Sequence, residues 1–188
     1  GGNFPDALAA APMASRGGWP LYLVDPARGI SADTLSAMNG VKEVTIMGGK
    51  AVVSPGVEAE LKERYGDTGV RRLSGVDRYA TAAEAAHYSV SSADLGLSWN
   101  GVGVTTGNNF PDALAGGVVQ GKRGTVMLLT PSKTLAAPAA DKLSANKLKI
   151  DFVVYYGGPT AVTDGVRKAV STLRSEEHTS ELQSRHNL

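Results

Sequence analysis

The chain has 188 residues, of which 42% are hydrophobic and 20% charged, the composition of an ordinary globular protein of one or two domains. Its formal net charge of +1 gives no general attraction to nucleic acid or to a membrane surface. The absence of cysteine excludes disulfides, thiolate metal sites and a cysteine nucleophile. No apolar run approaches the roughly 20 residues of a membrane span.

Short, continuous apolar runs alternate with stretches of helical composition. Runs rich in Val, Ile and Leu are typical of strands buried on both faces of a parallel sheet. In chain order the pattern predicts a helix at 5–15, a strand at 21–24, helix 31–38, strand 44–47, helices 55–65 and 78–89, strand 102–106, helix 111–120, strand 126–129, helix 133–145 and strand 152–156. This alternation predicts an α/β fold with mostly parallel sheets flanked by helices.

The chain contains an internal repeat. Asn3–Ala9 returns letter for letter as Asn109–Ala115, 106 positions later (109 − 3 = 106), and Val44–Gly49 later matches Val153–Gly158. The repeat predicts two tandem modules, residues 1–68 and 69–173. The first opens without Met at its Asn-Phe-Pro-Asp turn, so we expect its natural start upstream. It lacks the strand that precedes this turn, which predicts an exposed sheet edge.

The last fifteen residues, 174–188, match nothing in the repeat and contain two of the three histidines. Residues 174–184 resemble the in-frame translation of a common DNA-sequencing adapter. We interpret 174–188 as a non-native tail and exclude it from the fold prediction. The alternative is a polar native C-terminus, helical or not.

The repeated turn has the chemistry of a helix start. Asn109 and Asp112 stand in the N-cap and N3 positions of a capping box, with Pro111 in the first turn. Capping explains these residues, but the turn also follows a buried strand, and ligands of open α/β folds bind at that edge. Both interpretations stay open.

A second motif, Arg71–Ala82, occurs once. Asp77 is a natural N-cap, and Tyr79 follows in the first turn of the helix. Arg78 also lies in this first turn, where a cation opposes the helix dipole. Its charge therefore indicates either an intramolecular pair, for which Asp112 is the candidate, or an anionic ligand.

Little in the chain predicts catalysis. His87 is the only histidine outside the tail, and a position on a helix surface explains it. There is no Gly-x-Ser-x-Gly nucleophile turn. Gly48-Gly49 and Gly157-Gly158 follow strands but form no complete nucleotide fingerprint. We therefore predict no enzyme activity, no cofactor and no metal site.

Taken together, the Asn-Phe-Pro-Asp-Ala-Leu-Ala turns, the Gly-Gly segment leading to Ser54 and the motif from Arg72 to Ala82 resemble the bacterial cell wall binding repeat 2 family. The resemblance spans residues 1 to 173. It implies Toprim-like or Rossmann-like α/β modules, typically three in tandem, packed as a pseudo-threefold trimer. It also implies a secreted Gram-positive surface protein held noncovalently to the wall, in some members through an anionic secondary polymer.

The resemblance assigns candidate ligand contacts to both motifs. They are Asn3, Asp6, Asn109 and Asp112 in the repeated turn, and Asp77, Arg78 and Tyr79 in the single motif. Arg16 and Lys122, basic at matching positions in the two copies, are additional candidates for anion contact.

Pro131 replaces the acidic residue found at Asp25, which argues against a role for that carboxylate in both units. The Asp-x-Asp pair of enzymatic Toprim domains is absent, which argues against metal-dependent phosphoryl chemistry.

The sequence therefore predicts noncovalent anchoring of a surface protein to the cell wall. The expected partners are a wall polysaccharide or anionic wall polymer and a further repeat of the parent chain, without nucleic acid or membrane insertion. The alternative is part of a peptidoglycan hydrolase, an N-acetylmuramoyl-L-alanine amidase or its modifier, with the catalytic domain outside this chain. A nucleotide-binding module is disfavoured because the fingerprint is missing.

Overall fold

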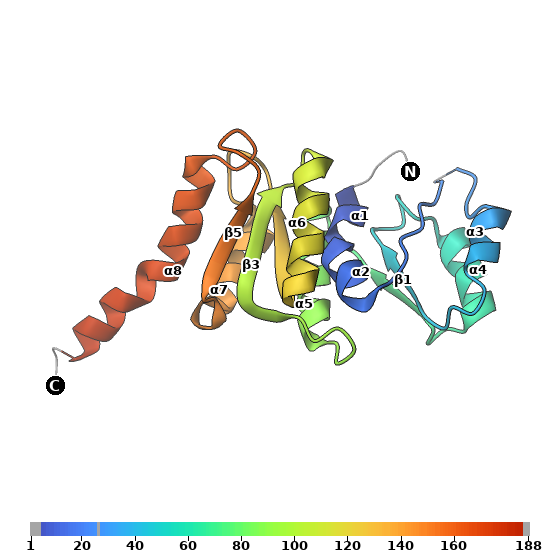
Figure 1. The fold of residues 1–188 in the computed structure, drawn as a ribbon, viewed down its shortest axis with the longest axis horizontal. Helices are drawn as coiled ribbons and strands as arrows, with labels where there is room; N and C mark the ends of the chain where they lie inside the picture. Colours follow the sequence, from blue (N-terminus) through green and yellow to red (C-terminus); the bar gives the residue numbers. More distant parts are fainter. Residues whose placement is uncertain (1–4, 26, 186–188) are drawn as a thin grey trace.

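The computed structural model describes the backbone of residues 5–25 and 27–185, and the side chains of 6–25 and 27–175. Its elements alternate between helix and strand as an α/β chain does (Figure 1). In order they are α1 (Pro5–Ala9), α2 (Ala11–Gly17), α3 (Ala32–Ala37), β1 (Val44–Met47), α4 (Pro55–Tyr65), β2 (Val70–Leu73), α5 (Arg78–Ser91), β3 (Ser98–Thr106), α6 (Phe110–Arg123), β4 (Thr125–Thr130), α7 (Ala137–Ala145), the 3-10 turn η1 (Lys147–Lys149), β5 (Phe152–Tyr156) and α8 (Asp164–Arg185).

The second copy of the repeat forms a three-stranded parallel sheet in the order β4-β3-β5. The central strand β3 pairs Val104 with Leu128 on one side and with Tyr155 on the other. Its buried stretch from Gly101 to Thr106 confirms the prediction that this apolar run is covered on both faces. The predicted mixed α/β fold with parallel sheets is thereby confirmed.

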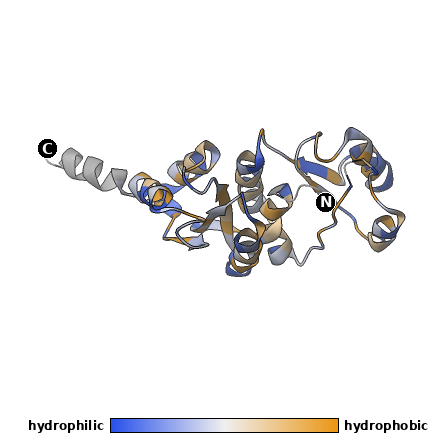
Figure 2. Ribbon diagram, turned by 90° about the horizontal axis from the view of Figure 1, so that it is seen from above, coloured by the Kyte–Doolittle hydropathy of each residue, from blue (hydrophilic) through white to orange (hydrophobic). Residues whose placement is uncertain are grey.

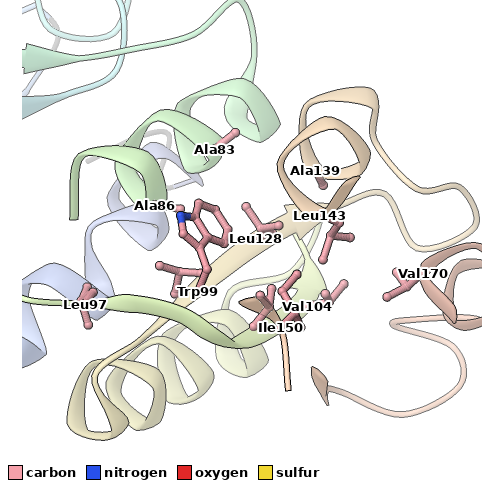
Figure 3. Close-up of a cluster of buried hydrophobic side chains, with 12 residues drawn as sticks. Ala83, Ala86, Leu97, Trp99, Val104, Leu128, Ala139, Leu143, Ile150 and Val170 are labelled. Atoms are coloured by element: carbon pink, nitrogen blue, oxygen red, sulfur yellow. The ribbon is translucent and has the colours of Figure 1, made fainter. Parts of the chain in front are cut away.

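The main hydrophobic core lies on one face of this sheet. Val102 and Val104 of β3 and Val126 and Leu128 of β4 alternate with residues that face away, as the two-residue period of a strand requires. Trp99 lies beside Ala86 of α5 and Leu128, with Leu143 of α7 and Val170 of α8 completing the cluster (Figure 3). Residues on this side therefore come from helices α5, α7 and α8.

The opposite face of β4 joins the two copies. Met127 and Leu129 pack with Leu8 and Met13 of the first copy, Ala82 and Ala85 of α5, and Ala113 of α6. Beside this core α2 lies along α6, as Figure 1 shows. Most helices have hydrophobic and hydrophilic residues on different sides (Figure 2), as expected for helices that each cover a core.

The first copy forms a smaller, two-stranded parallel sheet. β1 pairs with β2, with Val44 opposite Val70 and Met47 opposite Leu73. A separate core of Met38, Ile46, Val57, Leu61 and Val70 lies between this sheet and helices α3 and α4. β2 begins after residue 68, so a strand from the second predicted module completes the sheet of the first.

The predicted strand at 21–24 is wrong. These residues belong to no strand, although the matching run in the second copy is β4. β4 is ordered by pairing with β3, whereas residues 21–24 belong to neither of the two described sheets. Apolar composition alone cannot form a strand without a neighbour to accept its hydrogen bonds.

Two helices differ from the prediction for local reasons. The helix at 5–15 is divided into α1 and α2, because Pro12 has no backbone N–H and disfavours a continuous helix, whereas its counterpart Val118 lies inside the unbroken α6. The helix predicted from Lys133 begins at Ala137. Thr130 Oγ1 donates to Thr134 O (2.7 Å) and accepts from Ala136 N (2.8 Å), which fixes the preceding residues in a turn.

The final helix α8 continues from the second copy into the segment interpreted as a tail. Arg174 Nη2 donates to the carbonyl oxygens of Ile150 and Asp151, at 3.2 and 3.1 Å. The non-native origin of 174–188 stays a prediction. Among the described helices, none is long and apolar enough to cross a membrane.

Candidate functional site

The two copies of the Asn-Phe-Pro-Asp turn place their aspartates in matching environments. A Cβ added to Gly48 would lie 2.6 Å from Asp6 Oδ2, and one added to Gly157 would lie 2.6 Å from Asp112 Oδ2. Both glycines follow a parallel strand and have positive φ, +100° and +102°. A side chain at either glycine would be strained and would displace the carboxylate. The structure therefore repeats one arrangement, an aspartate at a helix start lying over a glycine at a strand end.

The capping prediction is confirmed in part. Asn109 is the N-cap of α6, and its Oδ1 accepts from Phe110 N at 3.0 Å. In the contacts of the described residues, Asp112 does not complete a capping box, because its carboxylate lies over Gly157. Asp6 occupies the equivalent place in α1, and Asn3 lies outside the described residues.

The single motif folds against the same turn. Asp77 is the N-cap of α5 and accepts from Ala80 N at 2.8 Å, as predicted. Arg78 Nη1 donates to the carbonyl oxygen of Gly107 at 2.8 Å, and Tyr79 Oη donates to Asn108 Oδ1 at 3.2 Å. The predicted pair between Arg78 and Asp112 is therefore wrong.

These contacts bring two distant motifs together at the carboxyl end of β3. We call this surface the carboxyl-edge rim; its residues are Asp77, Arg78, Tyr79, Asn108, Asn109 and Asp112. Asp77, Asn108 and Asn109 are exposed and the other three are half-buried. The rim offers amide, carboxylate, phenol and guanidinium groups to an approaching ligand, a set suited to hydroxyl-rich molecules. Sequence reasoning missed Asn108.

Arg16 and Lys122 lie elsewhere. They occupy the last turns of α2 and α6, at the ends of these helices opposite the aspartate turns. Arg16 Nε donates to the carbonyl oxygen of Leu95 at 2.8 Å, and Lys122 is exposed beside Arg123. The structure therefore places the sequence-predicted residues in two sets, and cations at helix C-termini also favour the helix dipole.

A pair of carbonyl groups is held by an arginine in each copy. In the first, Arg72 donates to Gly48 O (2.7 Å) and Val53 O (3.1 Å) and forms an ion pair with Glu58 at 2.9 Å. The Arg72 guanidinium, by hydrogen bonding to the Glu58 carboxyl, holds the pKa of that carboxyl below its ordinary value.

In the second copy, Arg167 holds the equivalent carbonyls, donating to Gly157 O (3.3 Å) and Val162 O (3.0 Å). Arg167 stands at the position of Glu58, 109 residues later (167 − 58 = 109), and its guanidinium lies 4.6 Å from the Tyr155 ring centre. The copies thus satisfy the same backbone groups with arginines from different elements, which a sequence repeat cannot reveal.

The Asp25 carboxyl stabilises its own turn. Its Oδ1 accepts from the backbone N–H groups of Ala27 (2.8 Å) and Arg28 (3.0 Å), and these bonds lower the pKa of Asp25. A local role of this kind agrees with its replacement by Pro131 in the second copy. Among the described residues no group of three or more His, Asp or Glu side chains could hold a metal ion, and His87 is exposed.

The parallel sheets and the repeated helix-start turn define an α/β protein with an internal structural repeat, and comparison with known proteins identifies its family. The model of the family Cell wall binding domain 2 (CWB2) matches residues 1–58 and 72–167. The chain belongs to this family, as its motifs predicted.

Relatives and solved structures agree with this assignment. The chain is 26% identical over 162 residues to the N-acetylmuramoyl-L-alanine amidase LytC of Bacillus subtilis, covering 85% of this chain and 30% of the amidase. It is 30% identical over 158 residues to the amidase enhancer of the same species, covering 84% and 20%. The chain thus spans less than a third of each relative.

The fold resembles Cwp6 and Cwp8 from Clostridium difficile. The TM-scores are 0.76 and 0.71, the identities 21% and 23%, and each match covers 90% of this chain and about a quarter of the solved one (26% and 27%).

Proposed function

We propose that this chain anchors a secreted surface protein to the cell wall by binding an anionic wall glycopolymer at its carboxyl-edge rim and at the matching Asp6 of the first copy. The observation that carries the proposal is the repeated aspartate over a glycine, Asp6 on Gly48 and Asp112 on Gly157. A polymer with repeating units can engage two such positions at once. Weak individual contacts are then strengthened by their linkage.

The chemistry of the rim supports a sugar ligand. The carboxylates of Asp6 and Asp112 receive no hydrogen bond among the described residues, so both can accept from sugar hydroxyls. Arg78 uses one guanidinium nitrogen for Gly107 and keeps N–H groups for an anionic substituent. The second basic set, Arg16, Lys122 and Arg123, lies at the opposite helix ends, where a long polymer could also reach.

An exposed apolar stripe supports packing with a further repeat of the parent chain. Phe110, Leu114 and Val118 recur at helical spacing on α6 and are 45–49% exposed. Leu114 and Val118 share a shallow surface pocket with Trp19 and Leu21 of the first copy. An apolar patch of this kind marks an interaction surface. The division into modules at 1–68 and 69–173 is part of the same proposal.

Sedimentation with purified Gram-positive cell walls tests the binding. We expect the chain to sediment with the walls and to be released as salt rises, because exposed charge contacts are screened. The double variant Asp6→Asn/Asp112→Asn removes both carboxylate charges while keeping the side-chain shape, and we expect lower retention. The matched control Asp94→Asn changes a carboxylate away from the rim. Equal retention of all three proteins would contradict the role of the rim.

A second candidate function follows from the relatives. The similarity to an amidase and to an amidase enhancer supports a role as the wall-binding part of a peptidoglycan hydrolase whose catalytic domain lies in another part of the parent. Zymography with wall material tests whether this chain is itself catalytic: we expect no clearing zone from this chain alone, and a clearing zone would make it an enzyme.

A further inference from the structure

Two loops of the same shape follow β1 and β5, at residues 48–53 and 157–162. In each loop the second glycine of the Gly-Gly pair accepts, at its carbonyl oxygen, from the backbone N–H groups three and four residues later. These bonds run to Gly49 O from Val52 N (2.9 Å) and Val53 N (3.0 Å), and to Gly158 O from Ala161 N and Val162 N (both 3.0 Å). The two copies therefore build one tight loop at equivalent places, 109 residues apart (158 − 49 = 109).

An arginine joins the first and last carbonyl oxygens of each loop, Arg72 in the first copy and Arg167 in the second. The guanidinium group is planar and rigid, so two N–H groups that donate to two carbonyls fix the distance between them. Lysine has a single charged nitrogen on a flexible chain and cannot hold both carbonyls in this way. The half-buried Arg167 is further fixed by the ring of Tyr155, whose centre lies 4.6 Å from its guanidinium carbon. Each loop is therefore closed by an arginine side chain.

The repeated aspartates rest on these loops. In the second copy, Asp112 Oδ2 and the Cβ of Ala161 both lie 2.6 Å from the position that a Cβ would take on Gly157. The glycine at the start of the loop therefore touches the carboxylate on one side and the end of the loop on the other. Because Arg167 donates to the carbonyl oxygen of Gly157, it acts on the Asp112 carboxylate through the loop backbone.

We propose that Arg167 and Arg72 are positioning residues for the wall polymer: each fixes a loop glycine and thereby the direction of the aspartate above it. The inference rests on the proposed function, which assigns the polymer contacts to Asp112 and Asp6. A binding group meets its ligand in one geometry only when packed neighbours hold it. A carboxylate on a loose loop loses conformational freedom when it binds, and it therefore binds more weakly.

Sedimentation of the intact chain with purified Gram-positive cell walls tests the proposal through a double-mutant cycle. The proteins are the unaltered chain, Arg167→Lys, Asp112→Asn and the double variant. We expect each single substitution to weaken the apparent affinity for walls about fivefold, and the double variant to be no weaker, because Arg167 then has no carboxylate to position. The cycle with Arg72→Lys and Asp6→Asn tests the first copy in the same way.

The outcomes of the cycle separate this inference from the proposed function. No binding by the unaltered chain, or undiminished binding by Asp112→Asn, would overturn the proposed function and the positioning with it. A loss in Asp112→Asn with none in Arg167→Lys would overturn the positioning alone. Losses that add up in the double variant would overturn it too, because a substitution that only loosens the fold weakens binding with or without the carboxylate.

Helix α8 offers a matched control variant. Arg174 also donates to two backbone carbonyls, those of Ile150 and Asp151, but these precede β5 whereas the loop follows it. We expect Arg174→Lys to bind walls as the unaltered chain does. A loss equal to that of Arg167→Lys would mean that any weakened arginine contact of this helix lowers binding, and it would overturn the proposal.

The direction of the Asp112 carboxylate can also be measured without the polymer. Three-bond NMR couplings report the populations of the χ1 rotamers of an aspartate. We expect one rotamer for Asp112 in the unaltered chain and averaging over two or more in Arg167→Lys. Asp77, which accepts from Ala80 N at 2.8 Å, should keep one rotamer in both proteins. Unchanged couplings of Asp112, or averaging at both aspartates, would overturn the positioning role.

Discussion

Gly117 of α6 lies directly against Ala11 of α2, and the two residues occupy the same position of the repeat (117 − 11 = 106). A Cβ added to Gly117 would lie 2.5 Å from the Cβ of Ala11. One turn later Gly121 lies against Ser15, its own counterpart, in the same way. Equivalent residues thus meet where the helices of the two copies cross, and glycine in one of them permits the close approach.

Substitution of Gly117 should therefore weaken the packing of α6 against α2. Gly117→Leu places a large side chain in this contact, and we expect a loss of about 1–3 kcal/mol in the free energy of unfolding, the usual cost of overpacking a core. Urea denaturation measures it. Ala115→Leu, on the exposed side of the same helix, is the control. An equal effect of the two substitutions would mean that the helix contact carries no stability.

Removal of Arg72 should destabilise the small sheet of the first copy. Arg72→Ala leaves the carbonyls of Gly48 and Val53 and the carboxylate of Glu58 without their donor, at a cost of about 2 kcal/mol. Thermal and urea unfolding measure the change. The exposed Arg28→Ala should have little effect, and a comparable loss in that control would show that charge rather than these contacts is responsible.

Stability should fall in acid because of Glu58. Its pKa in the folded chain lies below the ordinary value of 4.5, chiefly through the Arg72 hydrogen bond. The Glu58 carboxyl therefore binds a proton more readily in the unfolded chain than in the folded chain. Its contribution to the free energy of unfolding is fully present above the pKa of Glu58 in the unfolded chain, and it is lost as pH falls through the pKa of Glu58 in the folded chain.

Urea midpoints measured between about pH 6 and pH 3 should therefore decrease, and Glu58→Gln should decrease less steeply. Asp25, whose pKa is lowered by the N–H groups of Ala27 and Arg28, should leave a residual slope. If the urea midpoint of Glu58→Gln depended on pH as steeply as that of the unaltered chain, the loss of stability in acid would not be due to the Glu58 carboxyl.

Capping and ligand binding at Asn109 can be separated by one substitution. Serine is as good an N-cap as asparagine, so Asn109→Ser should change the free energy of unfolding by less than about 0.5 kcal/mol, whereas Asn109→Ala should cost about 1 kcal/mol. If Asn109 contacts the polymer, both variants should bind cell walls less well than the unaltered chain. Full retention of Asn109→Ser would restrict this residue to capping.

The parts of the fold that depend on residues close together in the sequence were predictable from it. The caps at Asp77 and Asn109 and the strands β1 and β5 are correct, because a cap or a buried run is encoded within a few positions. The predicted strand at 21–24 was wrong because a strand forms only beside a partner strand, and the apolar pattern of these four residues does not reveal whether a partner is present.

The predicted partner of Arg78 was wrong for a related reason. The Arg78 guanidinium donates to the backbone carbonyl of Gly107. Every residue has a backbone carbonyl, so the sequence does not indicate which one an arginine will contact. The matching roles of Arg72 and Arg167 were likewise hidden, because they occupy different positions of the repeat and converge only in space.

The pairing of β2 with β1 changes where the chain can be divided. A protease that cut in the loop between α4 and β2, near Asp67, would not free two independent halves. The amino-terminal piece would stay attached through the β1–β2 ladder and through Val70, which lies in its core. A nicked molecule would therefore migrate as one particle under native conditions and as two bands only after denaturation.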